Sequence, residues 1–345
     1  MSVATSRAVE NFSRLTGATL ELSGGDAAFG WITEVQRCGG FFTTFAEIAA
    51  LCDLAVFIGS DRLFDAYPLL PEALWPTQHR PTRILLVGKF GTHTAASLAA
   101  RLEPATNVAG PLVESVDIDA DALARFFRCD STLTPLAIGH GPALQQLSYA
   151  IAQAHSRTLI LSPPHIDAAY SQLLYTALLN YVLLKASERS TAILPLGGAA
   201  TTLQQTLTWR TGWPGRIHYS ESAASYDPRL HRRQSAESTV TARGLEIYIS
   251  ELNSPADPTL TRSARSHLQH VNRIFIGCYP TELRPEDIVV PVSRIGIEHG
   301  GTMFRSDSAV AFYCPQTADA APVTARGILQ GMPAPATATN KPRRP

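Results

Sequence analysis

The stretches "LAVFIGS" at residues 54–60 and "RILLVGK" at residues 83–89 decide the fold of this chain. Each is a short, continuous apolar run that ends in a glycine and one polar residue. Such runs are typical of parallel strands that are buried on both faces of a sheet. Five further stretches share this pattern, and we expect strands there as well: 158–164, 192–198, 245–251, 273–280 and 287–293.

Helical patterns lie between several of these strands. In residues 167–188, Leu174, Leu178 and Tyr181 recur at helical spacing, and Asp167 is a suitable N-cap. Residues 93–102 predict a crossover helix. Because strands and helices alternate, the sequence predicts an α/β fold of Rossmann-like, doubly wound parallel sheets.

The length of the chain and its turn-rich segments suggest how it is organised. We expect a first α/β domain over 1–150 and a second over 151–330, with a polar excursion at 215–242. The segment 331–345 is rich in Pro, Ala and Thr, which predicts a flexible tail unless a partner orders it.

Composition excludes several classes of function. The chain has 345 residues, of which 45% are hydrophobic and 17% charged, and its formal net charge is zero. There is no basic field to attract nucleic acid or anionic lipid, and little self-repulsion against joining an assembly. The longest apolar run, 173–185, is shorter than the ~20 residues that span a bilayer. With no signal-like N-terminus, we expect a soluble, cytoplasmic protein.

Three blocks of sequence, 43–70, 193–220 and 274–307, resemble the B subunit of formylmethanofuran dehydrogenase. They resemble still more closely the B subunit of the methylotroph formyltransferase/hydrolase complex, a relative within the metal-pterin oxidoreductases. The most specific pieces are "TWRTGWP" at 208–214 and "GTMFR" at 301–305.

The resemblance implies a role in one-carbon metabolism. In that complex a metal-containing hydrolase (A) subunit, a formyltransferase (D) subunit and a C subunit convert formyl-tetrahydromethanopterin to formate through formyl-methylofuran. The cofactors of the complex are methylofuran and tetrahydromethanopterin. It implies that this chain is a non-catalytic structural subunit that supports the hydrolase.

Cysteine usage separates the two relatives. The B subunit of the dehydrogenase holds an iron–sulfur cluster and a metal bis-pterin, which require closely spaced thiolates. Here no cysteine precedes Cys38, and the five cysteines are scattered with no C-x-x-C pair. We therefore expect reduced thiols, no iron–sulfur domain, no metal, no bound cofactor and no catalytic residue in this chain.

Glycine-rich stretches are the candidates for a vestigial pterin cleft. Gly197 and Gly198 end a predicted strand, and Gly301, Thr302 and Arg305 lie in the stretch "IEHGGTMFRSDSAVAFY" at 297–313. The resemblance places that stretch near the pterin of the relatives. Two interpretations stay open: a leftover ligand site, or glycines that only allow close packing.

Other patterns have a structural and a functional interpretation. Residues 87–96 form either an anion-binding helix start or a tight turn. His267 and His270 lie on a solvated helix face or bind a metal. Trp209 and Trp213, with Arg210, are interface anchors or core residues. The alternative functions are a metal-pterin dehydrogenase subunit and a free-standing Rossmann-like binder of small molecules.

Overall fold

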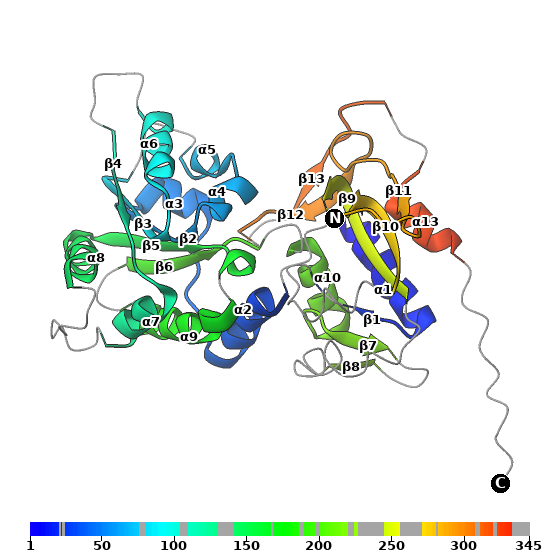
Figure 1. Cartoon of the computed structure of the whole chain (residues 1–345), viewed down its shortest axis with the longest axis horizontal. Helices are drawn as coiled ribbons and strands as arrows, with labels where there is room; N and C mark the ends of the chain where they lie inside the picture. Colours follow the sequence, from blue (N-terminus) through cyan, green and yellow to red (C-terminus); the bar gives the residue numbers. More distant parts are fainter. Residues whose placement is uncertain are drawn as a thin grey trace, which may run out of the picture. The chain divides into compact units, whose positions relative to one another are not determined.

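The structure is a computed structural model that divides the chain into two compact units (Figure 1). Unit 2 comprises Gly24–Gly198 and Ser306–Val310, and unit 1 comprises Met1–Ser23, Ala199–Arg305 and Ala311–Pro345. The structure describes residues 1–20, 22, 25–75, 81–103, 110–129, 141–166, 168–185, 190–197, 201–219, 224–226, 245–255, 271–280, 282–307, 311–319 and 323–332.

Unit 2 is built on a five-stranded parallel sheet in the order β4-β3-β2-β5-β6. Its strands are β2 (Leu54–Ser60), β3 (Arg83–Lys89), β4 (Leu112–Val116), β5 (Ser156–Leu161) and β6 (Ser190–Pro195). Four of the five were predicted from apolar runs. The fifth, β4, is an edge strand with the sequence "LVESV", in which Glu and Ser interrupt the apolar pattern.

Helices cover both faces of this sheet (Figure 1). On one side lie α3 (Phe45–Leu51), α4 (Arg62–Ala66), α5 (Leu70–Leu74) and α6 (Thr92–Arg101). On the other lie α2 (Gly25–Cys38), α7 (Ala120–Cys129) and α9 (Ala168–Lys185), while α8 (Gly141–Gln153) lies beside β4. Parallel strands with helices on both faces make a doubly wound α/β fold, so the predicted fold class is confirmed.

The core of unit 2 follows from strand alternation. Successive side chains of a strand point to opposite faces, so Ala55 and Phe57 of β2 meet one helical layer and Val56 meets the other. Phe57 is fully buried and lies in one cluster with residues from α3, α4, α5 and α6. Its ring contacts Trp75 edge-on with centroids 6.3 Å apart. Both faces of the central strands are therefore apolar, as the continuous runs predicted.

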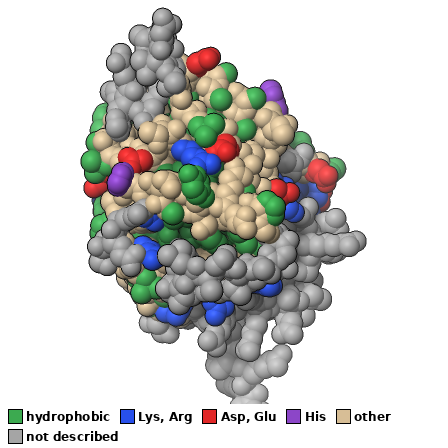
Figure 2. Space-filling view, turned by 90° about the vertical axis from the view of Figure 1, so that its left-hand side faces the viewer, with side chains coloured by type: hydrophobic (Ala, Val, Ile, Leu, Met, Phe, Trp, Pro, Cys, Tyr) green, Lys and Arg blue, Asp and Glu red, His purple; other side chains and the backbone are tan. Residues whose placement is uncertain are grey.

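The outer face of unit 2 near β4 and α8 carries a mixed surface. Figure 2 shows positive and negative side chains scattered among neutral and hydrophobic ones on its described part. No large field of one sign lies there, which agrees with the zero formal net charge. Separately, none of the described helices has the length and apolar character that crossing a membrane requires.

The described residues of unit 1 form three small sheets. Its parallel sheet has the order β11-β10-β9, β1 pairs with β7 and β7 with β8 in an antiparallel sheet, and β12 and β13 form a hairpin. The strands are β1 (Thr19–Leu20), β7 (Ile217–Tyr219), β8 (Ala224–Tyr226), β9 (Leu245–Pro255), β10 (Asn272–Tyr279), β11 (Ile288–Val290), β12 (Gly301–Phe304) and β13 (Ala311–Cys314). The helices are α1 (Val3–Thr16), α10 (Thr201–Thr211) and α13 (Ala325–Gly331).

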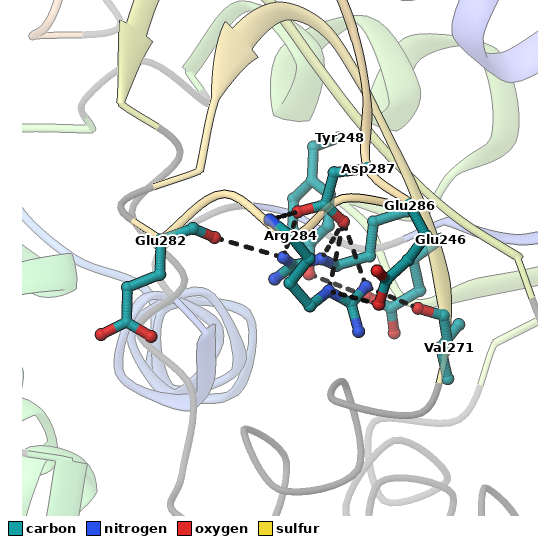
Figure 3. A network of polar contacts seen from close by, with 8 residues as sticks. Glu246, Tyr248, Val271, Glu282, Arg284, Glu286 and Asp287 are labelled. Atoms are coloured by element: carbon teal, nitrogen blue, oxygen red, sulfur yellow. Dashed lines mark hydrogen bonds and ion pairs between the residues drawn. The ribbon is translucent and has the colours of Figure 1, made fainter.

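An ion-pair network fastens the parallel sheet of unit 1 (Figure 3). The carboxylate of Asp287, whose side chain is fully buried, accepts hydrogen bonds from Arg273 at 2.8 Å and from the backbone N–H of Arg284 at 2.8 Å. Arg284 also donates to the Val271 carbonyl at 2.8 Å. These bonds lower the pKa of Asp287 to about 2, with those from Arg273 contributing most. The network ties the beginning of β10 to the loop before β11.

Helix α1 is held by two further buried carboxylates. Glu10, which is fully buried, pairs with Arg14 at 2.7 Å and with Arg210 of α10 at 2.6 Å. Glu251 of β9 accepts the backbone N–H of Ser2 and, at 2.5 Å, the hydroxyl of Thr5. These contacts assign the first residues of the chain to unit 1.

The chain divides at other places than the expected boundary near residue 150. β5 and β6 follow that position in sequence, yet β5 pairs with β2 in register from Leu54–Arg157 onward and β6 pairs with β5. Strands that are hydrogen-bonded to one another form one sheet, so β5 and β6 belong to the same unit as β2. Unit 2 therefore extends to Gly198. The expected excursion at 215–242 contains β7 and β8, and its residues 220–223 and 227–242 lie outside the described part of the chain.

Candidate functional site at the carboxyl edge of the parallel sheet

The strand order of unit 2 creates a switch point beside β2. From β2 the chain moves outward through β3 to β4, and it later continues on the other side of β2 through β5 to β6. Where the winding direction reverses, the two neighbouring loops leave the sheet in opposite directions, and open α/β sheets bind ligands at that carboxyl edge. The relevant edge lies between the ends of β2 and β5.

A serine, a histidine and a tyrosine meet at this edge. Ser162 directly follows β5, and a short 3-10 turn (Pro163–His165) brings His165 back so that its Nδ1 lies 2.7 Å from the Ser162 Oγ. Tyr67 comes from the end of α4, and its hydroxyl lies 3.4 Å from the same Oγ. The Tyr67 hydroxyl also donates to the Leu196 carbonyl, 3.3 Å away, just after β6.

The burial of Ser162 limits the chemistry of this cluster. Its side chain is only 1% exposed, so a substrate does not reach the Oγ, whereas Tyr67 and His165 are partly exposed. The Ser162–His165 hydrogen bond therefore orients the imidazole, and the Tyr67 ring packs edge-on against that imidazole with centroids 6.2 Å apart. The arrangement is suited to binding through an imidazole and a phenol, not to nucleophilic attack by the serine.

Backbone packing shapes the neighbouring strand ends. Gly88 of β3 has φ +125°, and a Cβ at this position would lie 2.2 Å from the carbonyl oxygen of Gly59 in β2. Only glycine fits there. The same contact occurs in unit 1, where Gly277 of β10 has φ +66° and a Cβ would lie 2.2 Å from the Ser250 carbonyl oxygen of β9.

Residues 87–96 form the turn between β3 and α6, and an internal carboxylate occupies the start of that helix. Asp61, which follows β2, accepts the Gly91 N–H at 3.0 Å and the Thr94 hydroxyl at 2.6 Å. A ligand phosphate at this helix start would have to displace Asp61 and would meet its negative charge. The tight-turn interpretation of this stretch therefore holds.

The five predicted vestigial-cleft residues fall in different units. Gly197 belongs to unit 2, where its N–H donates to the Ser306 carbonyl at 3.0 Å, and Gly198 lies outside the described residues. Gly301 and Thr302 begin β12 in unit 1, and Arg305 follows this strand. Their role in binding a ligand stays a prediction.

The glycines of the 297–313 stretch are closely packed. A Cβ at Gly300 would lie 2.3 Å from the Tyr313 hydroxyl, and one at Gly301 would lie 2.9 Å from Ile295. His299, the preceding residue, contacts buried Glu251 with 3.3 Å between Nε2 and Oε1. These contacts favour the packing interpretation of the two glycines.

The other sequence candidates have separate outcomes. Trp209 is 64% exposed, as an interface anchor would be, whereas Trp213 is half-buried and stacks on Tyr226 with centroids 5.9 Å apart. His267 and His270 lie outside the described residues. Within the described part of the chain, no three His, Cys, Asp or Glu side chains are grouped in a way that could hold a metal ion.

Two of the described cysteines, Cys52 and Cys278, are buried. Burial raises the pKa of Cys52 in unit 2 and of Cys278 in unit 1 to about 11 each. At neutral pH both side chains are protonated thiols, while iron–sulfur clusters bind thiolates. An iron–sulfur cluster at either residue would therefore have to supply the free energy that deprotonates a buried thiol.

Comparison with known proteins shows a shared fold. No protein-family model matches the sequence. The chain is similar to a chain in the crystal structure of the formyltransferase/hydrolase complex (FhcABCD) of Methylorubrum extorquens with methylofuran, with a TM-score of 0.69 and 17% identity. The similarity covers 96% of this chain and 87% of that one. At this identity the similarity shows the fold.

A shorter match joins the chain to a different protein. Over 82 residues, 24% of this chain, it is 30% identical to the FAD synthase of Halorubrum lacusprofundi. The matched region spans 44% of that enzyme, less than half of its length.

Sequence reasoning missed the cluster of Tyr67, Ser162 and His165. The signal was present, since "SPPH" at 162–165 puts a serine and a histidine directly after a predicted strand. Tyr67 gave no such signal, because it reaches the edge from a helix end that lies 95 positions before Ser162.

Proposed function

We propose that this chain is a structural subunit of a formyltransferase/hydrolase complex and has no catalytic residue of its own. The complex would convert formyl-tetrahydromethanopterin to formate through formyl-methylofuran. This chain would support the hydrolase (A) subunit, together with the formyltransferase (D) and C subunits. One observation carries the proposal: nearly the whole chain shares its fold with a chain of such a complex.

The surroundings of three described side chains, Ser162, Cys52 and Cys278, fit a role without chemistry. Ser162 is buried beneath the switch point, so it is not placed as a nucleophile. Cys52 and Cys278 are protonated thiols in different units. A pterin-dependent oxidation of formate would need a ligated metal and an electron relay, and these residues supply neither.

Purification of the assembly from its native source tests the proposal. A tag on this chain should recover the hydrolase, formyltransferase and C subunits in a fixed ratio, and the intact mass should correspond to that ratio. A tagged chain that runs alone under mild conditions would refute the proposal. Stoichiometric tungsten or molybdenum bound to this chain would instead favour a metal-pterin dehydrogenase subunit.

A second candidate function is a free-standing binder of a small molecule. The Tyr67–Ser162–His165 cluster at the switch point and the partial match to an FAD synthase favour it. This candidate predicts that FAD, ATP or a pterin raises the melting temperature of the isolated chain, and that His165→Ala abolishes the increase. If none of the three compounds shifts the melting temperature, this candidate is rejected.

A further inference from the structure

The end of α10 and the β12–β13 hairpin present exposed aromatic side chains in unit 1. Trp209 is 64% exposed and Tyr313 is 67% exposed. Thr302 pairs with Tyr313 across the hairpin, and Phe304 lies two residues from Thr302, so Phe304 and Tyr313 share one face. Trp209 packs edge-on against Phe304 with centroids 5.0 Å apart. We call the surface of Trp209, Phe304 and Tyr313 the Trp209 face.

The Trp209 face is held in a fixed conformation. The Phe304 N–H donates to the Thr202 hydroxyl at 2.9 Å, which joins the hairpin to the first turn of α10. At the other end of α10, Arg210 pairs with buried Glu10 of α1 at 2.6 Å. Since α10 is fastened at both ends and the hairpin is bonded to α10, the backbone that carries the rings loses little freedom on binding, which favours affinity.

Helix α10, which carries Trp209, packs against α1, and the two helices together are positive although the whole chain is neutral. Helices α1 and α10 contain three arginines, Arg7, Arg14 and Arg210, and one acidic residue, Glu10. Their combined formal net charge is therefore 3 − 1 = +2. Glu10 is fully buried and shared by Arg14 and Arg210, so its charge does not face solvent. The Arg14 side chain, by contrast, is 61% exposed.

We infer that the Trp209 face is the surface through which this chain binds another, different subunit, one that offers an apolar pocket rimmed by carboxylates. The inference rests on the proposed function. Exposed Trp, Tyr and Arg are the residue types that dominate binding energy in protein interfaces. A second copy of this chain is a poor occupant, because a two-fold contact places like surfaces together and would oppose the arginines of the two copies.

One variant tests the face directly. Trp209→Glu, in the full-length tagged chain expressed in its native host, puts a carboxylate where the partner is expected to offer one. Leu69→Glu is the matched control, since Leu69 is equally exposed in unit 2 at 72%. We expect Trp209→Glu to lower the assembled complex per tagged chain at least tenfold by native mass spectrometry, and Leu69→Glu to leave it unchanged. Circular dichroism and melting temperature check that both variants fold.

The outcomes separate the inference from the proposed function. If the wild-type chain runs alone, the proposed function fails. If the wild type assembles and Trp209→Glu assembles equally well, the inference fails. A homodimer that Trp209→Glu dissociates would also overturn it.

The chemistry of the partner is tested with a photoreactive benzoylphenylalanine in place of Trp209. We expect the cross-linked peptide to come from another chain of the complex and to carry Asp or Glu. We also expect the wild-type assembly to weaken as sodium chloride is raised, because exposed charges are screened. A cross-link to a second copy of this chain, or to a peptide without acidic residues, would contradict the inference.

Discussion

The two units each contain a parallel sheet but stabilise it differently. In unit 2 the central strands are apolar on both faces, and one of its buried carboxylates, Glu34, joins α2 to Gln172 and Thr176 of α9. In unit 1 buried carboxylates act at the sheet itself, with Glu251 in β9 and Asp287 just before β11. The five-stranded sheet is thus stabilised by burial of apolar surface, whereas the three-stranded sheet is also stabilised by buried ion pairs and hydrogen bonds.

The largest expected effect is the loss of a core ring from unit 2. Phe57→Ala should lower the free energy of unfolding by about 4 kcal/mol, because it leaves a cavity under a fully buried strand. Urea titration should detect the loss through Trp31 and Trp75, which lie in unit 2, while Trp209 and Trp213 report on unit 1. Leu69→Ala, at an exposed site, is the control and should change stability by less than about 0.5 kcal/mol. If Phe57→Ala lowered the stability reported by the tryptophans of unit 1 as much as that reported by the tryptophans of unit 2, the two units would not be stabilised separately.

In unit 1 the comparable change is electrostatic. Asp287→Asn should lower the free energy of unfolding by about 3 kcal/mol, because it leaves Arg273 and Arg284 without their shared counter-charge. Urea titration followed by the fluorescence of Trp209 and Trp213, the tryptophans of unit 1, should detect this loss of stability. Asp121→Asn, which removes the partner of exposed Arg125, should cost about 0.5 kcal/mol or less. If the two variants were equally stable, buried charge would not hold this sheet.

The glycine contacts at the strand ends are common to both units. Gly88→Ala in unit 2 and Gly277→Ala in unit 1 should each cost about 2 kcal/mol or slightly more, because the new methyl group meets a backbone carbonyl at positive φ. Each loss should be confined to its own unit in urea titrations. Gly141→Ala, with open space around its Cβ position, serves as the control. Tolerance of both substitutions would show that the strand ends can move apart.

Acid should weaken unit 1 through Asp287. The pKa of this carboxyl is lowered in the folded state, to about 2. The ionised carboxylate therefore contributes to the free energy of unfolding above its ordinary pKa near 4, and this contribution is lost as the pH falls toward 2. We expect about 2 kcal/mol of pH-dependent stability from this group. Unfolding measured between pH 5 and pH 2 should show it, and the dependence should be shallower in Asp287→Asn. An unchanged slope in that variant would contradict the assignment.

The sequence predicted most strands of the two parallel sheets because their apolar runs are local, whereas the strands of the antiparallel sheet and the hairpin were not predicted. Both quoted runs coincide with β2 and β3, and the five other predicted runs coincide with β5, β6, β9, β10 and β11. The boundary could not be predicted in this way, since it depends on β5 pairing with β2 across about a hundred residues. Edge strand β4 was missed because solvent on one side permits polar residues.

The candidate site was less predictable than the fold. Glycines at strand ends were visible, but their φ angles and the facing carbonyls come from tertiary structure. Tyr67, Ser162 and His165 meet only once β2 and β5 are neighbours. Likewise the buried positions of Glu10 and Glu251 depend on partners about two hundred positions away or more.

Because unit 1 is assembled from segments that lie far apart in the sequence, its fold has a consequence for synthesis on the ribosome. Helix α1 emerges early, but its partners do not: Arg210 lies 200 positions after Glu10, and Glu251 lies 249 positions after Ser2. All five strands of the large sheet are translated in the interval, so unit 2 can fold while α1 still lacks Arg210 and Glu251. A nascent chain halted far enough past β6 for this strand to have left the exit tunnel should therefore resist protease over the large sheet and be cleaved within α1.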